Sequence, residues 1–230
     1  MIEALALGVA GVALAGGAAH GMFHRNSPLF GRALSRLETR DRIVALTFDD
    51  GPHPRATPRI LDVLRAEGVP ATFFVLGRHA DRWPDVVARV VEDGHDVGNH
   101  GYQHARLHFA GPERVRDDLR RGTAAVAAAC GVSPRLFRAP HGFRSPFVTP
   151  VAQSLGQSTV GWTYGVWDSD RPGVAEIERR TVCQATPGAI VLLHDGDGDD
   201  PDGDRMQTAD ALPLIVRGLR RRGYNFARLP

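Results

Sequence analysis

Residues 43–51 read Ile-Val-Ala-Leu-Thr-Phe-Asp-Asp-Gly, an apolar run that ends in two adjacent carboxylates. The run predicts a buried β-strand with the carboxylates directly after it. Six further strands are predicted, at residues 71–76, 95–98, 136–139, 159–166, 189–193 and 224–228. Helices are predicted between them, at residues 57–68, 84–93, 112–130, 146–155, 174–185 and 208–222. Strands that alternate with helices indicate an α/β fold with about seven parallel strands, either an open sheet or an irregular (β/α) barrel.

Residues 4–19 carry no charge, and this apolar run extends weakly to residue 23. A helix that spans a bilayer needs about 20 such residues. The run is typical of a signal peptide, a signal anchor or a poor membrane helix. We expect an apolar signal or anchor segment with a linker at residues 1–42, and one globular domain at residues 43–230. The location is predicted to be membrane-associated, secreted or periplasmic. Arginines downstream of the run favour a cytoplasmic C-terminal domain by the positive-inside rule, but the sequence alone leaves the sidedness open.

The basic residues exclude several function classes. All 28 are arginine, so a Schiff-base lysine and a P-loop lysine are both excluded. From residue 43 onward, 23 arginines face 23 acidic residues, and this part of the chain is formally neutral. Nucleic-acid binding requires surplus positive charge, so we predict no nucleic-acid partner, and we infer no protein partner.

Ionisable residues follow the predicted strands at their C-terminal ends. The carboxylates, histidines and arginine placed there are Asp49, Asp50, His100, His104, Arg138, Asp168, Asp170 and His194. In parallel α/β folds this end of the sheet carries the functional site. We therefore expect these side chains to meet on one rim.

His100 and His104 lie four residues apart, a spacing that suits two imidazoles on one metal ion, although a solvated pair is the alternative. Asp49 and Asp50 point in different directions, so one can bind the metal while the other reaches a water molecule, unless the pair serves only as a turn. Two histidines and one carboxylate leave open positions on a divalent metal. A free carboxylate and a further histidine would complete the groups needed for amide or ester hydrolysis.

These residues resemble the five motifs of the NodB-type polysaccharide deacetylases, carbohydrate esterase family 4, over residues 43–229. The motifs appear as Thr-Phe-Asp-Asp-Gly at 47–51, His-Gly-Tyr-Gln-His at 100–104, Arg-Ala-Pro-His-Gly at 138–142, a loose Trp-Asp-Ser-Asp-Arg-Pro-Gly at 167–173, and Val-Leu-Leu-His at 191–194. The resemblance implies the irregular (β/α) barrel and a metal-dependent hydrolase that removes N-acetyl groups from N-acetylglucosamine glycans of the chitooligosaccharide or peptidoglycan type.

By the same resemblance, Asp50, His100 and His104 would hold the metal, with zinc expected first and cobalt, nickel or manganese as alternatives. Asp49 would be the general base and His194 the general acid.

Supporting roles follow from the third and fourth motifs. Arg138 would position Asp49, and Asp168 or Asp170 would hold Arg138. The backbone N–H of His141, next to Pro140, would bind the oxyanion. Trp167 offers a sugar-stacking surface together with Trp162 and Tyr164, with core packing as the alternative for these rings.

This sequence departs from the family pattern at three places. Gly101 replaces a Ser or Thr that could steady the histidine loop, and His141 replaces a Tyr. The loose fourth motif weakens the assignment of a partner to Arg138. Two other functions stay open: an amide hydrolase that acts on a lipid-linked amino sugar or a non-sugar amide, and an inactive glycan-binding module.

Overall fold

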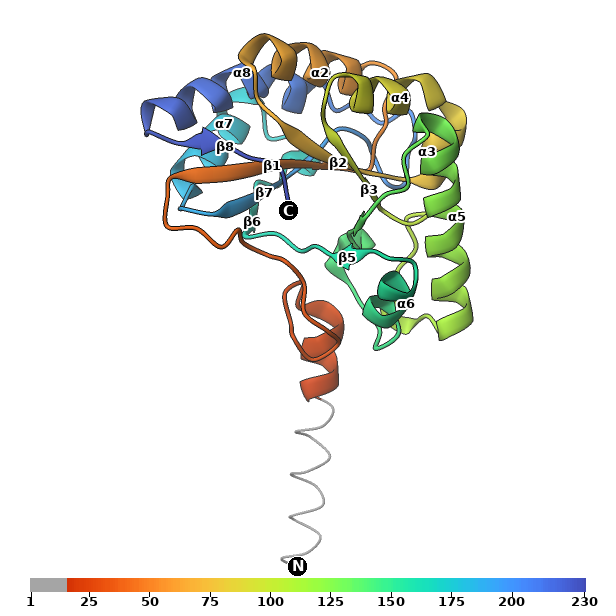
Figure 1. The fold of residues 1–230 in the computed structure, drawn as a ribbon. Helices are drawn as coiled ribbons and strands as arrows, with labels where there is room; N and C mark the ends of the chain where they lie inside the picture. Colours follow the sequence, from red (N-terminus) through yellow and green to blue (C-terminus); the bar gives the residue numbers. More distant parts are fainter. Residues whose placement is uncertain (1–15) are drawn as a thin grey trace, which may run out of the picture.

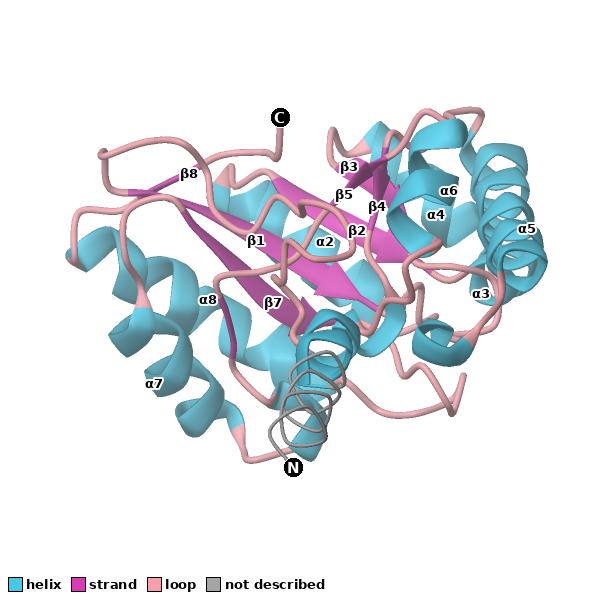
Figure 2. Cartoon of the chain, turned by 90° about the horizontal axis from the view of Figure 1, so that it is seen from below, coloured by secondary structure: helices cyan, strands magenta, loops and turns pink. Residues whose placement is uncertain are grey.

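The computed structural model describes residues 16–230. Its sheet follows the order β5-β4-β3-β2-β1-β7-β6, and β8 pairs with β1. All of these pairings are parallel. The strands are β1 (Ile43–Asp49), β2 (Ala71–Val75), β3 (Asp96–Asn99), β4 (Leu136–Phe137), β5 (Ser158–Thr159), β6 (Tyr164–Gly165), β7 (Ala189–His194) and β8 (Asn225–Phe226). The sheet curls into a half-barrel (Figures 1 and 2), so the predicted irregular (β/α) barrel is confirmed.

The helices cover the outer face of this curled sheet, as Figure 1 shows for α8, α2 and α4. They are α2 (Ala56–Glu67), α3 (Gly77–Arg82), α4 (Pro84–Glu92), α5 (Pro112–Cys130), α6 (Val148–Ser154), α7 (Val174–Gln184) and α8 (Met206–Arg221). Short 3₁₀ turns lie at η1 (Leu107–Phe109), η2 (Pro140–Gly142) and η3 (Asp168–Asp170). The largest apolar core forms between the sheet and this helical layer.

Strand β1 lies at the centre of the fold because apolar side chains on both of its faces are buried. Val44, Leu46 and Phe48 pack toward the largest core cluster, and Ala45 packs into a second cluster on the other face. A strand buried on both faces reads as a continuous apolar run, which explains the sequence signal at residues 43–48.

One predicted strand is wrong. Residues 159–166 do not form a single strand, because β5 pairs with β4 while β6 pairs with β7 at the other end of the sheet. The chain between them crosses the open side of the half-barrel. A segment from the N-terminal part lies beside this connection. Leu34 forms an isolated β-bridge with Val160, and Arg36 forms one with Ala189.

The N-terminal segment is described from residue 16, and residues 16–23 are helical. Most of the predicted anchor, residues 4–15, lies outside the described residues. Across residues 16–230, no helix combines the length and the apolar character needed to cross a membrane. The division into residues 1–42 and 43–230 stays a prediction, and the structure adds that residues 25–37 contact the larger part.

Candidate active site

Strand register brings the predicted rim residues together. β1 and β7 pair so that Asp49 lies beside His194. β3 and β4 pair through Asn99 and Phe137, which places the following residues, His100 and Arg138, side by side. The structure therefore gathers carboxylates, imidazoles and a guanidinium at the C-terminal ends of these strands, where the sequence predicts a site.

Asp50, His100 and His104 form a buried cluster. One ligand atom from each lies within 4.8 Å of the others. Oδ1 of Asp50 is 3.3 Å from Nε2 of His100 and 3.2 Å from Nε2 of His104. The same Oδ1 atom is buried and has no hydrogen-bond partner among residues 16–230. A buried carboxylate oxygen that faces two imidazole nitrogens fits a divalent metal ion, since oxygen and imidazole donors are the ligands that zinc takes.

The tautomer of His100 suits this role. Its Nδ1 lies 2.9 Å from the carbonyl oxygen of Arg138. A carbonyl oxygen only accepts, so Nδ1 carries the proton and Nε2 is left free toward Asp50. Burial lowers the pKa of His100, but the negative charges of Asp49 and Asp50 outweigh burial and raise it.

His104 is the outer member of the cluster. Its backbone adopts φ 59°, and its Nδ1 lies 3.7 Å from a carboxylate oxygen of Asp199. The chain at Gly198 runs so close to the His104 ring that a Cβ there would collide with it. Burial lowers the pKa of His104, which favours the neutral imidazole that binds metals.

Asp49 lies beside the cluster and is held by Arg138. Nη1 of Arg138 donates to Oδ1 of Asp49 at 2.6 Å and to Oγ1 of Thr47 at 2.8 Å. Nη2 donates to the carbonyl oxygen of Gly161 at 2.9 Å. Arg138 has no exposed surface, so its guanidinium fixes one oxygen of Asp49 and leaves the other free toward the cluster, 3.8 Å from Nε2 of His100.

The prediction that Asp168 or Asp170 holds Arg138 is wrong. Within residues 16–230, no hydrogen bond or ion pair joins Arg138 to Asp168 or to Asp170. Asp168 lies in the turn before α7 and contacts His194 instead, whereas Asp170 is exposed. The carbonyl of Gly161 and the hydroxyl of Thr47 take the place predicted for a carboxylate.

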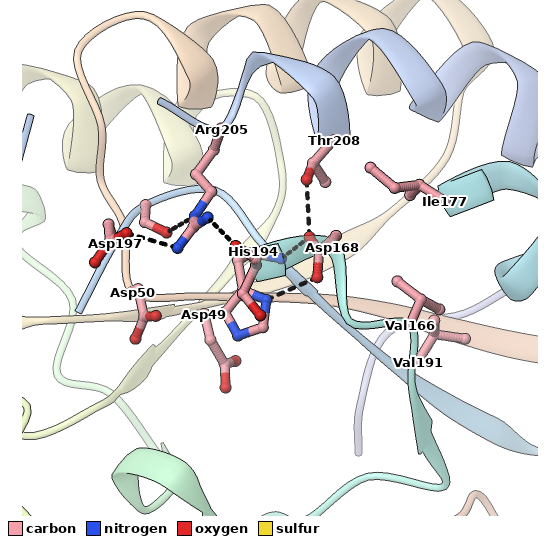
Figure 3. A network of polar contacts seen from close by, with 12 residues as sticks. Asp49, Asp50, Val166, Asp168, Ile177, Val191, His194, Asp197, Arg205 and Thr208 are labelled. Atoms are coloured by element: carbon pink, nitrogen blue, oxygen red, sulfur yellow. Dashed lines mark hydrogen bonds and ion pairs between the residues drawn. The ribbon is translucent and has the colours of Figure 1, made fainter. Parts of the chain in front are cut away.

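His194, which lines the same cavity, pairs with Asp168. Nδ1 of His194 lies 2.8 Å from Oδ1 of Asp168, and Oδ2 accepts the backbone N–H of His194 at 2.8 Å. Thr208 donates a third bond to Oδ2 at 2.8 Å, and Figure 3 shows the carboxylate between Thr208 and His194. Burial lowers the pKa of His194, but Asp168 outweighs it and raises the pKa to about 9.

His141 lies in η2 with Pro140 and adopts φ 58°. Its ring centroid is 4.3 Å from that of His104, so the ring packs against a predicted metal ligand. Burial and the nearby His104 lower the pKa of His141 to about 4, which keeps the ring neutral near pH 7. Pro140, the first residue of this turn, is buried.

The structure explains why glycine replaces the Ser or Thr of the family pattern at position 101. Its φ is +78°, and a Cβ at this position would collide with Oδ2 of Asp118 from α5. Asp118 accepts the backbone N–H groups of Tyr102 and Gln103 at 3.2 and 3.1 Å. Asp118 therefore steadies the histidine loop in the space that a Ser or Thr side chain would occupy.

A cavity of about 680 Å³ opens over these groups. Trp167 is 69% exposed and lines it, and Trp162 lines it as well. Tyr164 is buried, and its hydroxyl donates to the carbonyl of Thr181 at 2.8 Å, which agrees with the core-packing alternative for this ring.

Sequence reasoning missed several residues that support the site. Arg205 is buried and donates to the carbonyl oxygens of Gly196 and Ser169 and to the carboxylate of Asp197 (Figure 3). His79 lies on α3, and its Nδ1 is 2.8 Å from the carbonyl oxygen of Asp50. Neither residue falls in a recognisable motif, so only the tertiary structure reveals them.

Comparisons with known proteins agree with this geometry. The family model described as polysaccharide deacetylase matches residues 36–160. A chitooligosaccharide deacetylase of Bradyrhizobium sp. (strain ANU 289) is 40% identical over 199 residues, which cover 82% of this chain and 90% of that protein.

Solved structures show the same fold. A peptidoglycan N-acetylglucosamine deacetylase aligns with a TM-score of 0.79 and 31% identity, over 86% of this chain and 90% of that one. A pseudoenzyme of family CE4 from Bacillus anthracis aligns with a TM-score of 0.77 and 28% identity, over 85% of this chain and 66% of that one. A deacetylase and a pseudoenzyme thus share the fold, so the fold alone does not indicate whether a protein is active. The site residues have to be compared for that.

Proposed function

We propose that this chain, which belongs to the polysaccharide deacetylase family, is a metal-dependent hydrolase that removes N-acetyl groups from N-acetylglucosamine-containing glycans. The observation that carries the proposal is that a candidate metal site, a carboxylate and a histidine line one cavity. Asp49, fixed by Arg138, lies against the Asp50–His100–His104 cluster, and His194 lies beside Asp49 on the neighbouring strand.

Asp50, His100 and His104 would hold the metal, and their donor atoms favour zinc, with cobalt, nickel or manganese as alternatives. The bound ion would polarise the acetamide carbonyl and lower the pKa of a coordinated water.

The protein side chains would then move two protons. Asp49 accepts a proton from the attacking water, because its second oxygen is free of Arg138. His194 is protonated near neutral pH and donates a proton to the departing amine, which breaks the C–N bond. The backbone N–H of His141, in the turn that begins at Pro140, would bind the developing oxyanion.

The substrate class is supported by the names of similar proteins, which are chitooligosaccharide and peptidoglycan N-acetylglucosamine deacetylases. The cavity agrees with a sugar ring, because the exposed Trp167 and the ring of Trp162 line it together with the polar groups. An amide hydrolase for a lipid-linked amino sugar or a non-sugar amide would use the same groups. An inactive glycan-binding module is disfavoured, since the base, acid and metal-binding side chains are all present.

The test is acetate release from chitooligosaccharides, peptidoglycan and small N-acetyl compounds, each with the metal-free protein and after addition of zinc. The proposal predicts release from the chitooligosaccharides or peptidoglycan that stops with a chelator and returns with zinc. Release from small N-acetyl compounds alone would favour the non-sugar alternative. Glycan binding without any acetate release would favour the inactive module.

We also propose that residues 4–23 hold the protein at a membrane or direct its export, on the strength of their apolar composition. Reporter fusions at the C-terminus, combined with fractionation of the cells, would decide between these locations. A fully soluble cytoplasmic protein would contradict both.

A further inference from the structure

Arg144 ties the N-terminal segment to the loop that carries His141. Its guanidinium is buried and donates to three backbone carbonyl oxygens, those of Ser27 at 2.6 Å, Gly31 at 2.9 Å and Arg25 at 3.3 Å. Its backbone N–H donates to the carbonyl of Met22 at 3.1 Å. A buried guanidinium has lost its hydration, and leaving it without hydrogen bonds would cost free energy. The backbone carbonyls that accept its hydrogen bonds are therefore held in place against it.

The same segment holds Trp162. Nδ2 of Asn26 donates to the carbonyl oxygen of Trp162 at 2.9 Å, and the Arg25 guanidinium lies 5.4 Å from the centre of the Trp162 ring. Gly142 completes this contact, since a Cβ there would lie 2.6 Å from the Trp162 ring and 2.8 Å from Cβ of Arg25. The N-terminal segment, the His141 loop and Trp162 are therefore packed as one unit.

This unit reaches the cavity. Phe23, His24 and Arg25 line it together with Asp50 and His104. Phe23 is 48% exposed, whereas Asp50 is buried, so Phe23 stands near the mouth and the carboxylate near the floor.

Phe23 packs against two other rings at this mouth. Its ring packs edge-on against Phe143 at 5.4 Å between centroids, and it lies 5.1 Å from the ring of His108. Ligand pockets are typically lined by aromatic side chains together with a few polar groups, and the half-exposed ring of Phe23 beside these carboxylates and histidines fits that pattern. The apolar C–H face of a pyranose ring matches it in shape and polarity.

We propose that Phe23 is a substrate-contacting residue, which receives a sugar unit next to the one that is deacetylated, and that Arg25 and Asn26 position Trp162 for the same glycan. This inference rests on the proposed function. It assigns residues 22–31 to the active site rather than to a linker, so the segment must remain on the working enzyme.

The test uses the full chain with Phe23→Ala, and Leu29→Ala as the matched control. Leu29 lies in the same segment and is 57% exposed, but it does not line the cavity. Each variant is assayed on chitopentaose and on a small acetyl ester that needs only the catalytic centre. For Phe23→Ala we expect KM for chitopentaose to rise about tenfold with kcat within about twofold, and ester hydrolysis to be unchanged. For Leu29→Ala we expect wild-type values on both substrates.

The outcomes separate the two proposals. If the wild-type protein hydrolyses the ester but no glycan, the proposed glycan substrate fails. If the wild-type protein deacetylates chitopentaose and Phe23→Ala leaves its KM unchanged, the inference about Phe23 is wrong. Weaker co-sedimentation of that variant with phosphatidylglycerol vesicles, at an unchanged KM, would show that the ring faces lipid, and it would overturn the inference in the same way.

Discussion

The Asp168 carboxylate holds His194 at two points, with Oδ1 2.8 Å from the ring Nδ1 and Oδ2 2.8 Å from the backbone nitrogen. These two contacts orient the ring and leave Nε2 of His194 free for the substrate. The carboxylate also stabilises the imidazolium, because a buried carboxylate favours the charged form of its neighbour.

Asp168→Asn should shift the pH profile of kcat/KM. The pKa of His194 is raised to about 9, so the acid is protonated below that value and is lost as the pH rises through it. Without the Asp168 charge, burial would lower this pKa, and the alkaline limb of the profile should move to lower pH. Asp170→Asn is the control, since Asp170 is exposed on the same turn, and its profile should match the wild type. An unmoved alkaline limb in Asp168→Asn would contradict the assignment of His194 as the acid.

Arg138→Ala should destabilise the fold strongly. The substitution leaves the Asp49 carboxylate buried without its partner, which costs about 3–5 kcal/mol. Arg120→Ala removes an exposed pair with Asp117 and should cost about 0–1 kcal/mol. Urea unfolding monitored by circular dichroism measures both values. If both variants lose the same small amount of unfolding free energy, the Arg138–Asp49 pair does not stabilise the fold as the structure indicates.

His100→Ala should abolish stoichiometric metal binding. Zinc at about 100 times its Kd should stabilise the wild type by about 2.7 kcal/mol, and that gain should vanish in the variant. His95→Ala is the control, because His95 is also buried but precedes β3, at the opposite end of the strand from His100. Thermal unfolding with and without zinc, together with metal analysis, provides the readout. A zinc-dependent gain retained in His100→Ala would contradict the proposed ligand set.

Gly101→Ser, which restores the residue type typical of the family, should destabilise this protein. The substitution is strained at φ +78° and collides with Asp118, which costs about 1–3 kcal/mol or more. Gly131→Ser separates the two effects, since Gly131 has φ +73° but nothing within 4 Å of a Cβ. Gly101→Ser should lose more stability than Gly131→Ser in the same unfolding assay. Equal losses would show that the Asp118 contact does not matter.

Much of the fold follows from local patterns. The periodic helix at 112–130 and the buried strand beginning at 43 appear where the sequence predicts them. The run at 159–166 does not, because apolar character alone cannot tell one strand from two that pair at opposite ends of a sheet. The short helix α3 was missed, since six residues are too few for a helical period.

The candidate site also has parts that the sequence predicts and parts that it does not. Placing carboxylates and histidines at strand ends predicts that His100 and His104 meet Asp49 or Asp50, and the family resemblance then assigns Asp50 to the metal. The contact between Arg138 and Asp49 was predicted, but the acceptor for Nη2 of Arg138 was not, because it is a backbone carbonyl of Gly161 that only the tertiary fold brings close. The contribution of Phe23 was hidden for a related reason. Its neighbours have the composition of an anchor, and the tertiary contacts of Arg144, Arg25 and Asn26 show that the segment packs beside the cavity.

The most direct test of the central claim compares acetate release by the wild type and by Asp49→Asn, with the bound metal of each measured in parallel. Asparagine keeps the shape of the side chain but cannot accept the proton. We expect Asp49→Asn to bind zinc at the wild-type stoichiometry while its kcat on the chitooligosaccharide falls about 10²–10⁴-fold. Near-normal turnover with full zinc occupancy would contradict the account.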